Sequence, residues 1–352
     1  MFNLAYSMES NSPLESAMLN RKNYNEKHTK TVINMSKDVE ADSDYYNLEN
    51  GTAQELIDLV NEKGDVDESF EYSRYWHGYL IILKPLLLFM NYNQIRYVFL
   101  TLILILSTIF CVLLCKNLNI WYMLFFVFSI LITDLLIASA CINTAICFAI
   151  SLIGSIYIIC KKDKIKNIYL IFFLIGILTN IFDLLTTPII TLCFPAITYF
   201  MVIQKQDKCL KQLILISINW GIGYIGFWIT KWIITDIIFD RNIIENAFSQ
   251  ILYRTTGESI GMDILISRLK NFAGNYIFLL IYMLLTVYVV LLFINRKNKV
   301  NLTNIVYLLI SLIPLIWFVV LKNHSTVHAF FSYRNLCIVI YSLLIGIFIQ
   351  DN

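Results

Sequence analysis

This 352-residue chain changes from polar to apolar at the stretch Tyr72-Ser73-Arg74-Tyr75-Trp76-His77-Gly78-Tyr79. The apolar run Gly78–Met90, which begins at the end of this stretch, is too short to span a bilayer, which takes about 20 apolar residues, and it contains Lys84 and Pro85. A run of this length is typical of an interfacial or re-entrant helix. We therefore predict that the stretch places an arginine, a histidine and several aromatic rings where water meets lipid.

The composition of the whole chain is that of a membrane protein. Hydrophobic residues make up 58% of it and charged residues only 15%, and the mean hydropathy is +0.67. This balance indicates a polytopic membrane protein and not a soluble domain with a large core. The net charge of +2 gives no basic field for nucleic acid. The eight cysteines form no CxxC motif, so we expect small packing residues in helices and neither a disulfide framework nor a zinc knuckle.

The apolar runs from Tyr97 onward predict about nine transmembrane helices, assigned by the length that a helix needs to cross a bilayer. They lie near 97–115, 119–134, 143–160, 168–182, 184–203, 212–235, 273–294, 302–321 and 335–349, and the stretch 119–160 also admits another division. Residues 1–96 hold two capping-box signals, at Ser12–Glu15 and at Thr52–Glu55, and then the interfacial helix. The sequence thus predicts an all-α polytopic membrane protein: an extracytoplasmic helical region over 1–96 and a transmembrane domain over 97–352.

Lysine and arginine are densest in three short connections. These are the stretch 161–166, the link that contains Lys205, Lys208 and Lys211, and the link that contains Arg296, Lys297 and Lys299. Clustered basic residues in short loops mark the cytoplasmic side, and the three links share one side if the segments alternate. The region 1–96, the loop near 236–272 and the loop near 322–334 then face outward. We expect a multi-pass protein of the cell membrane with a cytoplasmic C-terminus.

An outward N-terminal region needs a hydrophobic segment to carry it across the membrane, and no such segment precedes it here. Either the first predicted helix acts as a reverse anchor, or the natural start lies upstream and Met1 is internal. Phe2–Tyr6 reads like sequence from the middle of a domain, which favours an upstream start.

Ionisable side chains gather at the outward ends of the predicted segments. Such groups are costly near hydrocarbon and tend to be paired or functional, so one charged face suggests a site for an anionic, lipid-borne substrate. Arginine binds phosphate through paired hydrogen bonds, and lysine binds it as a point charge. We assign substrate or phosphate binding to Arg74, His77, Asp183, Lys231, Lys322, His324, His328 and Arg334. The alternative for the cations is that they only extend to lipid headgroups, and it applies most to Lys231, between Trp228 and Trp232.

His324 and His328 are four residues apart, which is a metal-ligand spacing if their segment is helical. No HExxH motif accompanies them, so we expect no zinc site and no resident cofactor, and the need for a divalent metal stays open. We expect them to donate hydrogen bonds to phosphate or to move a proton; the alternative is polar loop residues without a role. Asp183 lies at what looks like a tight outward hairpin, where it either forms the turn or belongs to the site. The same two alternatives, turn former or site residue, apply to Asp134.

A glycosyl transfer needs a carboxylate to take the proton of the acceptor hydroxyl. The acidic residues before Arg74 are the candidates: Asp42 and Asp44, and then Asp67, Glu68 and Glu71. Most residues of an acidic loop are merely solvated, so no single one stands out. We take Asp42, Asp44 and Glu71 as the candidate catalytic acids.

This layout resembles the GT-C class of integral membrane glycosyltransferases. The resemblance rests on the segment Arg74-Tyr75-Trp76-His77-Gly78, on the stretch from His324 to Arg334, and on helices of uneven length. It implies a polyprenyl-phosphate-linked sugar as donor and a catalytic acid just after a first transmembrane helix. The chain departs from that pattern because no transmembrane helix precedes residue 72. Either Asp42, Asp44 or Glu71 is then the base, or the true base lies outside these residues.

The leading hypothesis from the sequence is a membrane glycosyltransferase that moves a sugar to an extracytoplasmic acceptor, either an envelope polymer or a lipid. The chain contains no glycine-rich phosphate loop and no dinucleotide motif, which argues against ATP-driven transport and cytoplasmic nucleotide-sugar chemistry. The alternative is a transporter or flippase for a lipid-linked saccharide, which would favour internal repeats and polar residues deep within helices. A noncatalytic membrane assembly protein is a third reading.

Overall fold

The computed structural model describes residues 74–203, 208–239, 242–256, 261–294 and 302–351, and all regular structure in those ranges is helical. Five helices are long and apolar enough to cross a membrane, and four shorter ones are also apolar. The predicted fold class, an all-α polytopic membrane protein, is therefore confirmed. The two capping-box signals at Ser12–Glu15 and Thr52–Glu55 lie outside the described residues, as do the candidate acids Asp42, Asp44 and Glu71.

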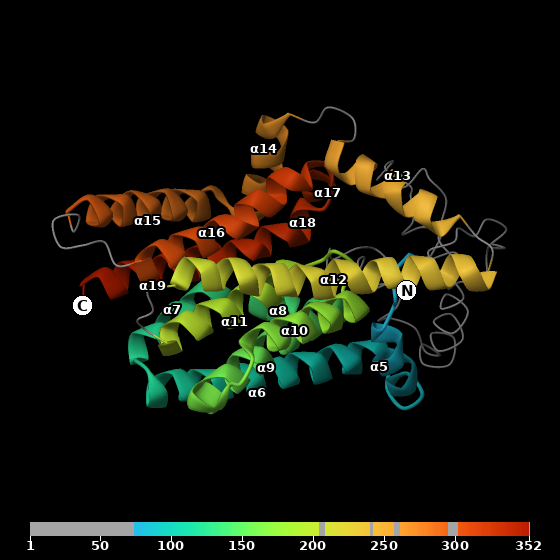
Figure 1. Cartoon of the computed structure of the whole chain (residues 1–352), viewed down its shortest axis with the longest axis horizontal. Coiled ribbons are helices and arrows are strands. Elements are labelled where there is room, and N and C mark those ends of the chain that lie inside the picture. Colours follow the sequence, from blue (N-terminus) through green and yellow to red (C-terminus); the bar gives the residue numbers. More distant parts are fainter. Residues whose placement is uncertain (1–73, 204–207, 240–241, 257–260, 295–301, 352) are drawn as a thin grey trace.

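The nine apolar helices coincide with the nine predicted segments to within a few residues at most ends. They are α6 (Tyr92–Asn117), α7 (Ile120–Ile132), α9 (Ile142–Lys161), α10 (Ile168–Phe182), α11 (Pro188–Ile203), α12 (Cys209–Phe239), α15 (Asn275–Ile294), α16 (Leu302–Val320) and α19 (Leu336–Asp351). They run side by side along the long axis of the molecule (Figure 1). The lengths of these helices therefore agree with the lengths that the hydropathy pattern predicts.

Asparagine side chains set the start of three of these helices. Asn91 forms a capping box with Gln94, in which each side chain is bonded to the other residue's backbone at 2.8 and 2.9 Å. Asn119 and Asn167 cap α7 and α10 in a simpler way, by accepting from backbone N–H groups in the first turn. An asparagine N-cap satisfies a backbone donor that the helix itself leaves unpaired. The Asn91 cap explains why α6 begins before residue 96, inside the region that the sequence assigned to the N-terminal part.

The interior of the bundle is formed mainly by α11 and α19. Nearly every side chain of α11 from Pro188 to Met201 is buried, and so is most of α19. The apolar side chains of α6, α12 and α15 are largely exposed. A helix that is apolar all round belongs in the protein interior, and exposed apolar helix faces belong against lipid. The outer helices therefore supply the lipid-facing surface.

Helices α10 and α12 approach each other most closely at two glycines. A Cβ atom at Gly176 would lie 2.2 Å from the carbonyl oxygen of Trp220, and one at Gly223 would lie 2.2 Å from that of Phe173. Small residues at a helix contact let two backbones approach, which is the common packing device in membranes. This contact fixes the position of α12, which carries several residues of the site.

Shorter helices and 3-10 turns occupy the connections between the apolar helices. They are α5 (Tyr79–Leu86), α8 (Leu135–Ala138), α13 (Ile243–Thr256), α14 (Met262–Ala273), α17 (Lys322–Val327) and α18 (Ala329–Ser332), with 3-10 turns η2 (Lys162–Lys164) and η4 (Tyr333–Asn335). The sequence predicted loops near 236–272 and 322–334, and the structure corrects this to helices. The apolar residues that α14 buries, Leu265, Leu269 and Ala273, recur at helical spacing.

The two ends of the bundle differ in charge. Helices α9, α11 and α15 finish at one end of the bundle, and α10, α12 and α16 begin there. The basic connections in the sequence join these pairs of helices, so we call this end the basic end. The C-terminal helix α19 also ends there, at the left of Figure 1. The opposite end, where α10 and α12 finish, holds α5, α13 and α17 and is called the site end. The helix order thus places the predicted basic links on one side and the candidate site residues on the other.

Candidate functional site

The segment from Arg74 to Tyr79 is held against the site end of α10 and α12. The backbone N–H of Gly78 donates to the carbonyl of Ile181 at 2.8 Å, and a Cβ at Gly78 would lie 2.3 Å from the Ile181 side chain. Trp76 donates through Nε1 to the carbonyl of Phe227 at 3.0 Å and stacks on the Phe227 ring. A glycine is needed at residue 78 because only it allows this close approach.

Arg74 is fixed through both its backbone and its side chain. Its carbonyl oxygen accepts from the indole N–H groups of Trp228 at 2.5 Å and Trp232 at 3.0 Å. Its guanidinium, in a residue only 8% exposed, donates through Nη1 to Oδ1 of Asn246 on α13 at 2.8 Å. The Asn246 amide therefore orients the guanidinium. A buried, oriented guanidinium is suited to a phosphate or carboxylate group.

His77 and Lys231 lie close to the same segment. His77 adopts a left-handed backbone conformation with φ of 51°, and its Nδ1 is 3.4 Å from the hydroxyl of Tyr79. The ammonium of Lys231 lies 5.5 Å from the centre of the Trp76 ring. Such a cation–π contact holds the charge beside the segment. Arg74, His77 and Lys231 thus form one group, which we call the arginine group.

Asp183 is the centre of the connection between α10 and α11. It is 1% exposed, and its two carboxylate oxygens accept from the backbone N–H groups of Leu185, Thr186 and Thr187 at 2.8–3.2 Å. The Tyr224 hydroxyl and the Cys147 thiol also donate to it, at 3.4 and 3.5 Å. Burial raises the pKa of this carboxyl, and the hydrogen bonds from Thr186 and Thr187 oppose the shift. Of the two alternatives, the geometry favours the turn former, because its oxygens are engaged in holding the loop.

The loop that Asp183 holds presents one carbonyl to His324. Leu185 has a φ of 66°, in the left-handed region that a leucine rarely adopts. Its carbonyl oxygen lies 3.0 Å from Nε2 of the buried His324, on α17. Strained backbone persists only where its surroundings fix it, and here the Asp183 hydrogen bonds do so. The carbonyl is an acceptor, so Nε2 of His324 donates and carries the proton of the neutral ring.

The buried His324 and the half-buried His328 have rings 4.6 Å apart, and His328 stacks on Phe331 at 5.3 Å. Burial, together with the nearby charge of Arg254 on α13, lowers the pKa of His328 to about 3. Burial first, and then His328 and Arg254, lower the pKa of His324 well below 6.5. Both rings are therefore neutral at physiological pH. We call this pair with Asp183 and Arg254 the histidine group. Among the described residues, no group of three or more His, Cys, Asp or Glu side chains could hold a metal ion.

The remaining site candidates lie at other contacts of the site end. The guanidinium of Arg334 lies 5.2 Å from the centre of the Tyr333 ring, whose hydroxyl donates to Asp134 at 3.1 Å. Lys322 is half-buried at the start of α17, beside Asn323, which donates to the carbonyl of Tyr253 on α13 at 3.0 Å. The structure thus brings the candidates together in the arginine group, the histidine group and the Arg334–Asp134 contact.

Four aromatic residues of α12 connect these groups, and none of them is among the site residues predicted from the sequence. Trp220, Tyr224, Trp228 and Trp232 recur every four residues, which places them along one side of the helix. Trp220 donates to the hydroxyl of Thr191 at 3.1 Å, Tyr224 donates to Asp183, and the last two donate to Arg74. We call them the aromatic stripe. The four-residue repeat was visible in the sequence and could have identified it.

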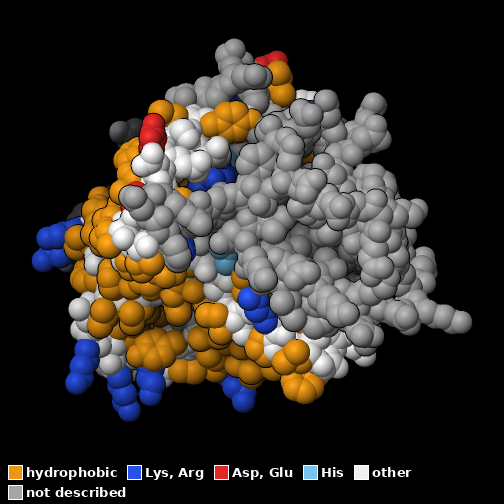
Figure 2. All heavy atoms as spheres, turned by 90° about the vertical axis from the view of Figure 1, so that its right-hand side faces the viewer, with side chains coloured by type: hydrophobic (Ala, Val, Ile, Leu, Met, Phe, Trp, Pro, Cys, Tyr) orange, Lys and Arg blue, Asp and Glu red, His pale blue; other side chains and the backbone are white. Residues whose placement is uncertain are grey.

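Figure 2 views the site end directly. Lysine, arginine and histidine side chains are visible there between apolar side chains and the residues that the structure does not describe. Comparison with known proteins adds nothing to this geometry: the chain matches no family model, no curated protein and no solved structure.

Proposed function

We propose that this protein is an integral membrane transferase that moves a sugar from a polyprenyl-phosphate donor to an acceptor on the outer side of the membrane. The observation that carries the proposal is a buried, oriented arginine and a pair of neutral histidines, one buried and one half-buried, at the end of an apolar helix bundle opposite its basic end. A lipid-linked phosphate has an apolar tail and an anionic head. The apolar helix bundle suits the tail, and the oriented arginine suits the head. The resemblance to GT-C glycosyltransferases agrees with the same reaction class.

The arginine group would bind the phosphate. Arg74 is held by Asn246 and by two tryptophans of the aromatic stripe, and a guanidinium is the side-chain group that binds phosphate oxygens through paired donors. When the sugar leaves, negative charge on the phosphate increases, and a fixed cation stabilises that charge more in the transition state than in the ground state. Lys231 adds a second positive charge next to the same segment. Arg334 and Lys322 belong to the same end and would contact the donor or the acceptor.

The histidine group would handle uncharged parts of the substrates. A neutral His324 that donates through Nε2 to Leu185 keeps Nδ1 as an acceptor. Such a nitrogen binds a sugar hydroxyl without attracting bulk anions. Asp183 would position the loop and not react. The base that activates the acceptor hydroxyl is then sought among Asp42, Asp44 and Glu71.

The test is to delete the gene in the source organism and complement it with variants. Wild-type protein should restore one sugar on an envelope glycan or lipid, measured by mass spectrometry, while Arg74→Ala should lower the transfer rate by about 10²-fold or more. Arg74→Lys keeps the charge but loses the paired donors and should recover only part of the activity. Lys84→Ala is the matched control, because Lys84 is an exposed cation in α5 at the same end.

Two outcomes contradict the proposal. Full sugar transfer by the Arg74→Ala protein at normal expression would remove the assigned phosphate ligand. Build-up of the complete lipid-linked saccharide on the cytoplasmic side of the deletion strain would indicate a flippase, because the sugar would be assembled and not moved across.

A further inference from the structure

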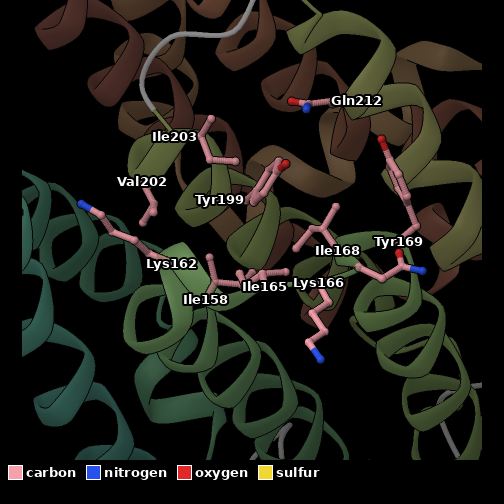
Figure 3. Close-up of a pocket in the computed structure, with 11 residues that line it drawn as sticks. Ile158, Lys162, Ile165, Lys166, Ile168, Tyr169, Tyr199, Val202, Ile203 and Gln212 are labelled. Atoms are coloured by element: carbon pink, nitrogen blue, oxygen red, sulfur yellow. The ribbon is translucent and has the colours of Figure 1, made fainter.

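A pocket of about 700 Å³ opens at the basic end, away from the candidate site. It lies among the C-terminal end of α9, the start of α10, the end of α11 and the start of α12 (Figure 3). Ligand sites in proteins commonly measure about 300–1,000 Å³, so its size is sufficient for a small headgroup. The proposed transfer reaction makes no use of it.

The lining of the pocket divides into an apolar part and a polar part. Ile158, Ile168, Val202 and Ile203 provide apolar surface. The side chains of Tyr169, Tyr199 and Gln212 provide hydroxyl and amide groups, which lie on one side of the pocket in Figure 3. Such a division matches an amphiphile, which has an apolar chain next to a polar head.

The charge around the pocket is positive. Lys162 and Lys166 line it, and their flexible stems carry the ammonium groups outward from its apolar part (Figure 3). The stretch 161–166 contains four lysines and one aspartate, and Lys208 and Lys211 follow at the start of α12. The helix α10 also begins here, so the positive end of its dipole faces the same region. These features favour an anionic group over a zwitterionic or neutral one.

We infer that this pocket binds the phosphate headgroup of an anionic phospholipid from the leaflet at the basic end. Basic pockets between transmembrane helices are known to bind acidic lipid headgroups. The lysines would contact the phosphate, the phenol and amide groups would bond to headgroup hydroxyls, and the isoleucines would contact the first part of an acyl chain. A free phosphate ion would use the same lysines but would leave the apolar part of the pocket without a partner, which is the reason for assigning the lipid.

The experiment measures the binding of phosphatidylglycerol to the purified full-length protein by native mass spectrometry, with phosphatidylcholine as the neutral reference. The variant Lys162→Gln/Lys166→Gln should bind phosphatidylglycerol about tenfold more weakly than the wild type. The matched control is Lys161→Gln/Lys164→Gln, which removes the same charge from the same stretch but from residues that do not line the pocket. It should bind within about twofold of the wild type. Val202→Phe, which fills the pocket and keeps all lysines, should also weaken binding.

Several results overturn the inference. Equal losses in the two lysine pairs would mean that the surface charge acts as a whole and that the pocket has no part in it. Unchanged binding in the Lys162→Gln/Lys166→Gln protein would exclude the assigned ligands. If inorganic phosphate displaced phosphatidylglycerol at equal concentration, or if phosphatidylcholine bound as well as phosphatidylglycerol, the occupant would not be an anionic lipid. A melting midpoint equal to that of the wild type shows that each variant is folded.

Discussion

The close contact of α10 and α12 should tolerate no side chain at Gly176. An alanine Cβ there would lie 2.2 Å from the carbonyl oxygen of Trp220 and 2.9 Å from the backbone nitrogen of Tyr224. An ordinary contact is about 3.4 Å or more, so the two backbones must separate by roughly 1 Å. Both obstructing atoms belong to the backbone and cannot rotate away. Overpacking of this kind costs about 1–3 kcal/mol of the free energy of unfolding.

Helix α12 provides the control. Nothing lies within 4 Å of a Cβ placed at Gly221 or Gly226, and alanine favours a helix interior over glycine by up to about 1 kcal/mol. We therefore expect Gly221→Ala and Gly226→Ala to be neutral or stabilising, whereas Gly176→Ala and Gly223→Ala should both destabilise.

The assay is the midpoint of thermal unfolding of detergent-purified protein, followed by tryptophan fluorescence. Trp220 and Trp228 lie on the aromatic stripe of α12 and will report on its displacement. Since that stripe also holds Asp183 and Arg74, the Gly176→Ala protein should lose sugar transfer as well. If Gly176→Ala and Gly223→Ala melt at the same temperature as Gly221→Ala, the reasoning about helix contact is wrong.

Three further predictions concern the histidine group, Asp183 and the orientation of the bundle. Because burial holds the pKa of His328 at about 3 and that of His324 well below 6.5, the unfolded chain binds protons between these values that the native protein does not. The stabilisation that the two neutral histidines contribute is fully present above about pH 6.5 and is lost as the pH drops towards 3. The melting midpoint of the wild type should therefore decrease between about pH 7.5 and about pH 5, and that of His328→Gln should decrease less. An equal decrease in the wild type and in His328→Gln would contradict this assignment. Asp183→Asn replaces one accepting oxygen by a donor that faces backbone N–H groups and should cost roughly 1–3 kcal/mol. Asp263→Asn, which changes an exposed acid in the first turn of α14, should cost less, about 0.3–1 kcal/mol. Equal unfolding midpoints in urea would refute the role given to the loop. The orientation can be tested in a protein whose exposed Cys115 and Cys160 are replaced by serine. A membrane-impermeant maleimide should label the Glu245→Cys variant in intact cells and the Lys166→Cys variant only after permeabilisation. Labelling of both variants from one side would exclude the proposed orientation.

The site illustrates which signals a sequence carries for a membrane protein. The sequence made the arginine, the histidines and Asp183 candidates by their type and by their position next to apolar runs. It did not identify Asn246, which orients Arg74, because an asparagine in an amphipathic helix has no distinguishing pattern. Nor did it indicate that His324 bonds to Leu185, since the two residues are far apart in the chain. Contacts of this kind arise from the packing of α13 and α17 against the ends of α10 and α12.

Hydropathy alone determined that the chain folds as an all-helical membrane protein, because a backbone in lipid must satisfy its own hydrogen bonds and a helix of about 20 apolar residues is the shortest local way to do so. The order of the helices, and with it the separation of basic links from candidate site residues, followed from the same local rule. Only the tertiary structure decided what the polar residues do. Asp183 became the centre of a loop, and a four-residue aromatic repeat became the support of Arg74, because hydrogen bonds between distant segments depend on which helix faces meet. That choice rests on close contacts such as Gly176 against Trp220, and no local pattern encodes the partner of such a contact.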